Sequence, residues 1–202
     1  MIGKWNKSVI LTYAGIVFSV IGIVLSFSLE NGAVFGMICL MIAGICDLFD
    51  GVVARKCERT EEEKAFGIQL DSLADVVNFT ALPTAIFMRT GLYKWYFIPV
   101  ICAYAVFSVA RLAFFNISAD SDEPVKYYRG LPVTFSALIF PIFYLFSFLI
   151  KGRAFTFFFA AVVLAVAILY VVDFKMPKPR GKAYIAFSAL AIVMLLVYIF
   201  AV

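Results

Sequence analysis

Histidine is absent from the 202 residues of this sequence. It is the most frequent general base near neutral pH and a common zinc ligand, so its absence excludes the usual routes to both functions. Acid–base or metal chemistry in this chain would have to use carboxylates, tyrosine, lysine or cysteine.

Charge is also scarce. Charged residues make up 15% of the sequence, hydrophobic residues make up 64%, and the mean hydropathy is +1.02. A soluble protein is about half apolar, so this composition indicates a membrane protein. The first apolar run, residues 9–29, could span a bilayer and no small-residue cleavage site follows it, so we expect no cleavable signal peptide. The four cysteines form no CxxC pair and are interpreted as small packing residues.

Seven stretches approach the roughly 20 apolar residues that a membrane-spanning helix needs. They lie near residues 8–29, 33–54, 68–88, 95–116, 133–150, 154–173 and 183–202. The connections are short except at 55–67 and 117–132, and no internal repeat is found. We therefore predict an all-α fold, a polytopic transmembrane helical bundle in which residues 1–202 form a single integral membrane domain.

Basic residues are distributed unevenly over the connections. If the amino terminus is cytoplasmic, thirteen lysines and arginines fall on the cytoplasmic side and four on the other side. The positive-inside rule favours this orientation. The net charge of +4 thus reflects topology first and attraction to anionic headgroups second, and nothing in it indicates nucleic-acid binding.

Four aspartates lie at the predicted cytoplasmic ends of two consecutive spans. Asp47 and Asp50 are three residues apart on the second span, and Asp71 and Asp75 are four apart on the third, so each pair shares a helix face. The two spans run antiparallel, which places the pairs at the same depth. Acidic residues in spans are costly and mark functional sites by default.

Four converging carboxylates would repel one another unless cations were bound between them. Oxygen ligands suit Mg²⁺ or Mn²⁺ rather than zinc. Two such ions would balance the four negative charges, so we predict two divalent cations held by these aspartates.

Small residues and one arginine accompany the acids. Gly51 and Ala54 each lie four residues beyond an aspartate, and Gly67 precedes the third span, so a ligand could approach the helix backbone there. Arg55 could pair with phosphate oxygens. Tight helix packing is the alternative explanation for the small residues.

These eight residues, in this order and spacing, resemble the signature of the CDP-alcohol phosphotransferase family. The resemblance implies an enzyme that moves a phosphatidyl group from a CDP-activated lipid to an alcohol and releases CMP. It implies a six-helix core, here with an extra C-terminal helix, around a polar cavity open to the cytoplasm, and a homodimer. It further implies that Asp47, Asp50 and Asp71 bind metal and that Asp75 is a ligand or the general base. The CDP part would be held by Gly51, Ala54, Arg55 and Gly67.

One departure from the family pattern is the spacer between Arg55 and Gly67, which is eleven residues where the common form has about eight. The additional residues fall in the charged stretch 58–64. We expect this stretch to be a solvated turn in a longer cytoplasmic loop.

The acceptor alcohol is indicated by a resemblance to the phosphatidylserine synthase branch of the family. The segment Asp71-Ser72-Leu73-Ala74-Asp75 and the tripeptide Gly130-Leu131-Pro132 both resemble that branch. Serine has a carboxylate that needs a cation, and the basic residues near the fourth and fifth spans are Arg111, Lys126 and Arg129. We hypothesise that Arg129, assisted by Lys126 or Arg111, holds this carboxylate; ordinary interfacial positive charge is the alternative.

Three other functions remain open at this point. The same chemistry could use glycerol 3-phosphate or inositol phosphate as acceptor, and the lipid donor could be ester- or ether-linked. The aspartates could instead bind a coupling ion in a transporter, although no inverted repeat is found. A non-catalytic membrane scaffold is the third alternative. We expect the protein in the cell membrane, with its active site facing the cytoplasm.

Overall fold

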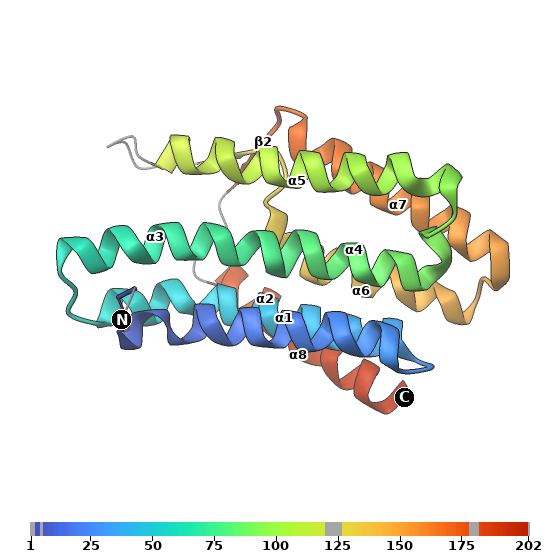
Figure 1. Ribbon diagram of the computed structural model, residues 1–202, viewed down its shortest axis with the longest axis horizontal. Coiled ribbons are helices and arrows are strands. Elements are labelled where there is room, and N and C mark those ends of the chain that lie inside the picture. Colours follow the sequence, from blue (N-terminus) through green and yellow to red (C-terminus); the bar gives the residue numbers. More distant parts are fainter. Residues whose placement is uncertain (1–2, 5, 120–126, 178–181, 202) are drawn as a thin grey trace.

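The computed structural model describes residues 3–4, 6–119, 127–177 and 182–201, and it is helical throughout most of them (Figure 1). The helices are α1 (Ile10–Ser28), α2 (Gly32–Lys56), α3 (Glu61–Val76), α4 (Leu82–Phe87), α5 (Ile98–Ala119), α6 (Ser136–Tyr144), α7 (Gly152–Val171) and α8 (Lys182–Ala201). Each of the seven predicted stretches contains helix, so the all-α prediction is confirmed.

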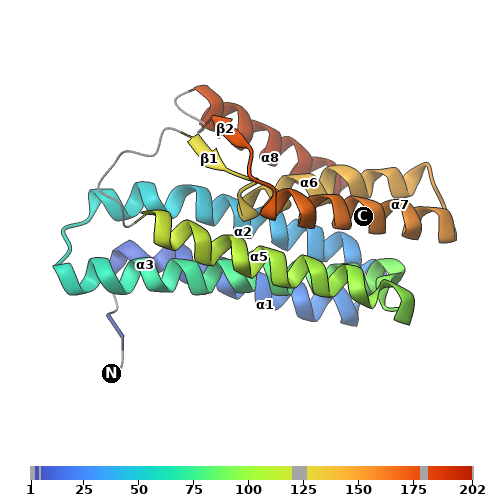
Figure 2. The same cartoon turned by 90° about the horizontal axis from the view of Figure 1, so that it is seen from above.

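Four helical segments within the described residues are long and apolar enough to cross a membrane. They are Lys7–Ser28, Gly32–Lys56, Trp95–Ile117 and Gly152–Val171. Figure 2 shows that α6, α7 and α8 lie on one side of α2 and α5, with α1 and α3 on the other side. The chain is therefore an integral membrane protein built as a layered helical bundle.

A seam of small residues lets α1 pack closely against α2. The buried residues of α1 recur every three or four positions and are all small or polar. At Gly22 an added Cβ would lie 2.6 Å from the Cβ of Cys39, so only glycine permits this approach. In a membrane such close backbone packing replaces the hydrophobic effect as the force between helices.

The predicted turn at residues 58–64 is wrong in part, because α3 already begins at Glu61. Thr60 and Glu63 form a capping box: the Glu63 amide donates to the Thr60 hydroxyl at 3.3 Å, and the Thr60 amide donates to the Glu63 carboxylate at 2.8 Å. Lys4 also pairs with Glu62 at 2.6 Å, which ties the amino-terminal segment to α3. The charged stretch thus extends the helix, and the loop from α2 shrinks to residues 57–60.

A π-helical turn, Val77–Ala81, joins α3 to α4, so the two helices form one rod (Figure 1). The turn is held by polar contacts with both neighbouring helices. Ser19 of α1 donates to the Asn78 side chain at 2.7 Å, and Tyr104 of α5 donates to the Phe79 carbonyl at 2.5 Å. Thr80 and Ser108 share a further hydrogen bond of 2.8 Å. These bonds fix the rotation of the rod that holds Asp71 and Asp75.

A short ladder that the sequence did not reveal closes the carboxyl ends of α5 and α7. Strand β1 (Tyr127–Arg129) pairs antiparallel with β2 (Lys175–Pro177). The ladder continues into Gly130, whose amide donates to the Phe174 carbonyl at 2.8 Å, and Leu131, whose amide donates to the Leu169 carbonyl at 3.0 Å. The connection before α6 is therefore bound to the end of α7.

Candidate active site

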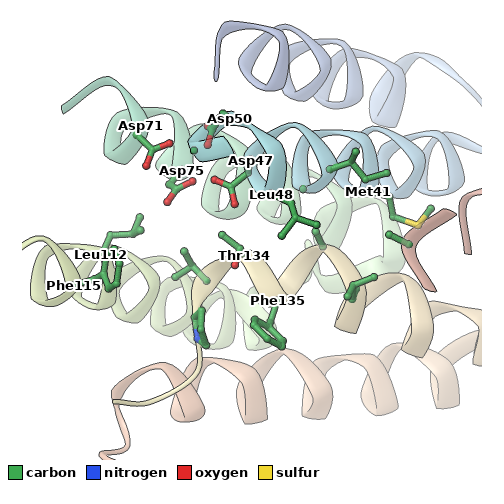
Figure 3. Close-up of a pocket in the computed structure, with 18 of the residues that line it drawn as sticks. Met41, Asp47, Leu48, Asp50, Asp71, Asp75, Leu112, Phe115, Thr134 and Phe135 are labelled. Carbon is green, nitrogen blue, oxygen red and sulfur yellow. The ribbon is translucent and has the colours of Figure 1, made fainter. Parts of the chain in front are cut away.

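The four aspartates meet where the carboxyl-terminal half of α2 passes the start of α3. Figure 3 shows Asp47 and Asp50 on α2 and Asp71 and Asp75 on α3, with their carboxylates turned toward one another. The antiparallel arrangement of the two helices brings residues separated by more than 20 positions to the same depth. The i, i+3 and i, i+4 spacings then direct each pair to the shared face.

Three of the carboxylates have the spacing of a metal site. Oxygen atoms of Asp47, Asp50 and Asp71 all lie within 4.8 Å of one another. Thr12 of α1 donates to Asp50 Oδ2 at 3.2 Å, and Asp50 is only 9% exposed. Because the Thr12 hydroxyl is hydrogen-bonded to one oxygen of Asp50, this carboxylate keeps a fixed orientation toward the other aspartates.

The fourth carboxylate has an unsatisfied oxygen. Asp75 Oδ1 is buried and has no hydrogen-bond partner within the described part of the chain. A buried polar atom without a partner is rare and requires an explanation such as a bound ion. Hard oxygen ligands at this spacing, together with that oxygen, fit a divalent cation of the Mg²⁺ or Mn²⁺ type.

The aspartates line one part of a cavity of about 480 Å³ between α2, α3, α5 and α6. The lining also includes Arg55 and Arg111, whereas the residues that precede Asp47 on α2 and those on α6 are small or apolar, among them Met41, Ile45 and Leu138. The cavity therefore changes from charged to apolar along its length. Such a cavity suits a ligand with a charged head and an apolar tail.

The structure separates the other predicted site residues into two groups. Gly51 and Arg55 line the cavity, and a Cβ at Gly51 would meet only Arg55 Nη1, at 3.5 Å. Ala54 and Gly67 are not among the residues that line it. A Cβ at Gly67 would instead approach Arg59 Nη1 at 3.8 Å and the Val9 side chain at 3.9 Å.

The three basic residues predicted for the acceptor also differ in position. Arg111 lines the cavity and is 6% exposed, and its Nε donates to the Leu131 carbonyl at 3.2 Å. Arg129 is exposed and lines a second, smaller cavity instead. Lys126 lies outside the described residues.

Sequence reasoning missed the polar residues that support the site from other helices. Thr12 contacts Asp50, and Ser72 donates to Asn116 of α5 at 3.0 Å. Thr134, two residues after the Gly130-Leu131-Pro132 tripeptide, lines the cavity. Threonine and serine are frequent in membrane helices, so only their positions in three dimensions distinguish them from packing residues.

The sequence profile described as CDP-alcohol phosphatidyltransferase matches residues 5–202. The chain belongs to the CDP-alcohol phosphatidyltransferase family. Family membership agrees with the resemblance drawn from the eight signature residues, and it disfavours the transporter and scaffold alternatives.

Curated relatives add the following similarities. The chain is 35% identical over 115 residues to CDP-diacylglycerol–serine O-phosphatidyltransferase of Helicobacter pylori, which covers 52% of this chain and 44% of that protein. It is 35% identical over 94 residues to the Bacillus subtilis protein of the same name, and the match covers 46% of this chain and 50% of that protein. It is 28% identical over 156 residues to archaetidylserine synthase of Methanothermobacter thermautotrophicus, and the match covers 76% of this chain and 63% of that protein. The chain thus spans about half the length of the first two relatives.

Proposed function

We propose that this CDP-alcohol phosphatidyltransferase family member transfers the phosphatidyl group of CDP-diacylglycerol, or the equivalent group of a CDP-activated ether lipid, to L-serine and releases CMP. The observation that supports this best is the cavity itself. Four carboxylates lie where a diphosphate with its metal ions would sit, and the lining becomes apolar where lipid chains would follow. The names of the similar proteins support serine as the acceptor.

The aspartates would hold two divalent cations, with Asp47, Asp50 and Asp71 as ligands and Asp75 as ligand or base. When bound, these ions supply charge neutralisation of the diphosphate and of the departing CMP. Gly51 lets the CDP part approach α2, and Arg55 contacts a phosphate oxygen. The family signature also assigns Ala54 and Gly67 to the CDP part, and because neither lines the cavity they would act by allowing close packing beside it. The serine hydroxyl loses its proton to a carboxylate as its oxygen bonds to the lipid-linked phosphorus, and the bond from that phosphorus to CMP breaks.

The acceptor would be oriented by Arg111. Its guanidinium is buried beside the cavity, and Arg111 Nε is fixed by the Leu131 carbonyl. A fixed, planar guanidinium suits a carboxylate. Lys126 and Arg129 would assist from the connection before α6. We further propose that the protein lies in the cell membrane as a homodimer with this site facing the cytoplasm.

The test is an acceptor comparison in proteoliposomes that contain radiolabelled CDP-diacylglycerol and Mg²⁺. We expect CMP release with L-serine to exceed that with glycerol 3-phosphate or inositol phosphate by at least about tenfold, because a phosphate dianion needs a denser basic cluster than this cavity offers. Faster CMP release with either phosphate would mean that this phosphate, and not serine, is the acceptor. The proposed transfer chemistry would still stand. No CMP release with any of the three would refute the proposed activity.

A further inference from the structure

A second cavity lies next to the catalytic one, between α5, the end of β1, and the last residues of α7 with those that follow them. Its volume is about 260 Å³, and its charged lining residues are Arg111, Arg129 and Asp173. A single water molecule needs only about 10–15 Å³ of cavity volume. The second cavity is therefore large enough for a small polar molecule.

Arg111 connects the two cavities because it lines both. Its guanidinium carbon lies 5.9 Å from the ring centroid of Phe115, and its Nε donates to the Leu131 carbonyl at 3.2 Å. These contacts hold the side chain at the boundary between the cavities. A guanidinium presents donors on more than one edge, so one arginine can contact a carboxylate on either side of that boundary.

The second cavity combines charges of opposite sign. Arg129 and Asp173 are both exposed, and neither forms an ion pair with any other residue that the structure describes. Arg129 also lies opposite Lys175 in the ladder. Like charges in opposed strand positions destabilise a ladder, so the presence of a basic residue at position 129 is not explained by the stability of the ladder.

We propose that the second cavity is a loading site for a zwitterionic amino acid, whose carboxylate contacts Arg129 and Arg111 and whose ammonium group contacts Asp173. The proposal rests on the proposed function, in which serine is the acceptor. Asp173 would repel an acceptor that has a phosphate, so this cavity selects the amino acid before it reaches the aspartates. Arg111 gives the carboxylate one continuous partner during passage into the catalytic cavity.

The test uses the full chain in proteoliposomes and measures CMP release at varied serine concentration. We expect Asp173→Asn and Arg129→Gln each to raise the KM for serine about tenfold, which is the effect of losing one hydrogen bond to a charged group. The KM for CDP-diacylglycerol should stay unchanged. The matched controls are Glu58→Gln and Arg153→Gln, two exposed residues outside both cavities, and they should leave the KM for serine unchanged.

Two fragments of serine separate the roles of the two charges. Ethanolamine lacks the carboxylate, and 3-hydroxypropanoate lacks the ammonium group. Inhibition by ethanolamine should weaken only in the Asp173→Asn variant. Inhibition by 3-hydroxypropanoate should weaken only in the Arg129→Gln variant. A general distortion of the cavity would weaken both inhibitors in both variants, and that result would overturn the assignment.

Two further results would also overturn it. One is an unchanged KM for serine in both variants while the wild-type chain uses serine, and this would leave the proposed function standing. The other is a loss that varies only with the anionic lipid content of the vesicles, which would make Arg129 a headgroup contact. If the wild-type chain does not use serine, the proposed acceptor and the loading site fail together.

Discussion

Replacing Asp75 by asparagine should reduce CMP release by about 10²–10⁴-fold, the range that a positioned general base contributes. Asp75 Oδ1 is buried and lacks a hydrogen-bond partner among the described residues, so replacing this oxygen breaks no hydrogen bond of that atom. Asparagine has nearly the same shape but neither takes up the serine proton nor neutralises a cation. The measurement is the initial rate of CMP release from CDP-diacylglycerol at saturating serine.

Thermal unfolding distinguishes loss of chemistry from loss of fold. Without metal, Asp75→Asn removes one of four repelling charges, so the variant should be at least as stable as the wild-type chain. Mg²⁺ should raise the unfolding temperature of the wild-type chain and raise that of the variant less, because a ligand stabilises the state that binds it. Glu30→Gln, an exposed acid between α1 and α2, is the matched control and should behave as wild type. Turnover by Asp75→Asn within about tenfold of wild type would exclude Asp75 as the base.

Replacing Gly130 by alanine should lower kcat/KM for serine by about three- to tenfold, because the required shift of a few tenths of an ångström is smaller than the misplacement of about 1 Å that costs about 10²-fold. Gly130 has φ +74°, and a Cβ there would lie 3.1 Å from the Val172 carbonyl oxygen and 3.2 Å from that of Tyr170. These contacts are tighter than ordinary van der Waals distance, so the connection and the end of α7 should separate by a few tenths of an ångström. Because Leu131 follows directly and its carbonyl accepts the bond from Arg111 Nε, the guanidinium should move with it.

The control for this variant is Gly152→Ala. Gly152 also has positive φ, +62°, but an added Cβ would meet nothing within 4 Å. Both variants introduce the backbone strain of about 1–3 kcal/mol that a left-handed residue costs, but only Gly130→Ala should impair the use of serine. The KM for CDP-diacylglycerol should be similar in both. Equal serine kinetics for the two variants would mean that the 130–131 connection does not position Arg111.

The sequence alone predicted the helices and the aspartate cluster because both depend on local spacing. Apolar stretches of about 20 residues fold as helices in a bilayer whatever their neighbours. Asp47 with Asp50, and Asp71 with Asp75, share helix faces by periodicity, and the antiparallel course of two consecutive spans places the two pairs at the same depth. No contact between distant segments was needed for either inference.

The residues that the sequence did not reveal depend on contacts between distant segments. Thr12 meets Asp50 from a helix 38 positions earlier, and the β1–β2 ladder joins segments on either side of α6 and α7. The charged stretch before α3 was misread as a turn, because three consecutive glutamates suggest solvent exposure. Thr60 caps the helix there, and acidic residues in a first turn stabilise the helix because they interact favourably with its dipole.

The most direct test of the central claim, that the aspartates hold divalent cations that enable phosphatidyl transfer, is a metal titration of the wild-type chain. The protein is stripped with a chelator, reconstituted with CDP-diacylglycerol and L-serine, and assayed for CMP and for phosphatidylserine as Mg²⁺ or Mn²⁺ is returned. We predict that both products are absent without a divalent cation and then appear in equal amounts. Undiminished formation of the two products in excess chelator would contradict the account.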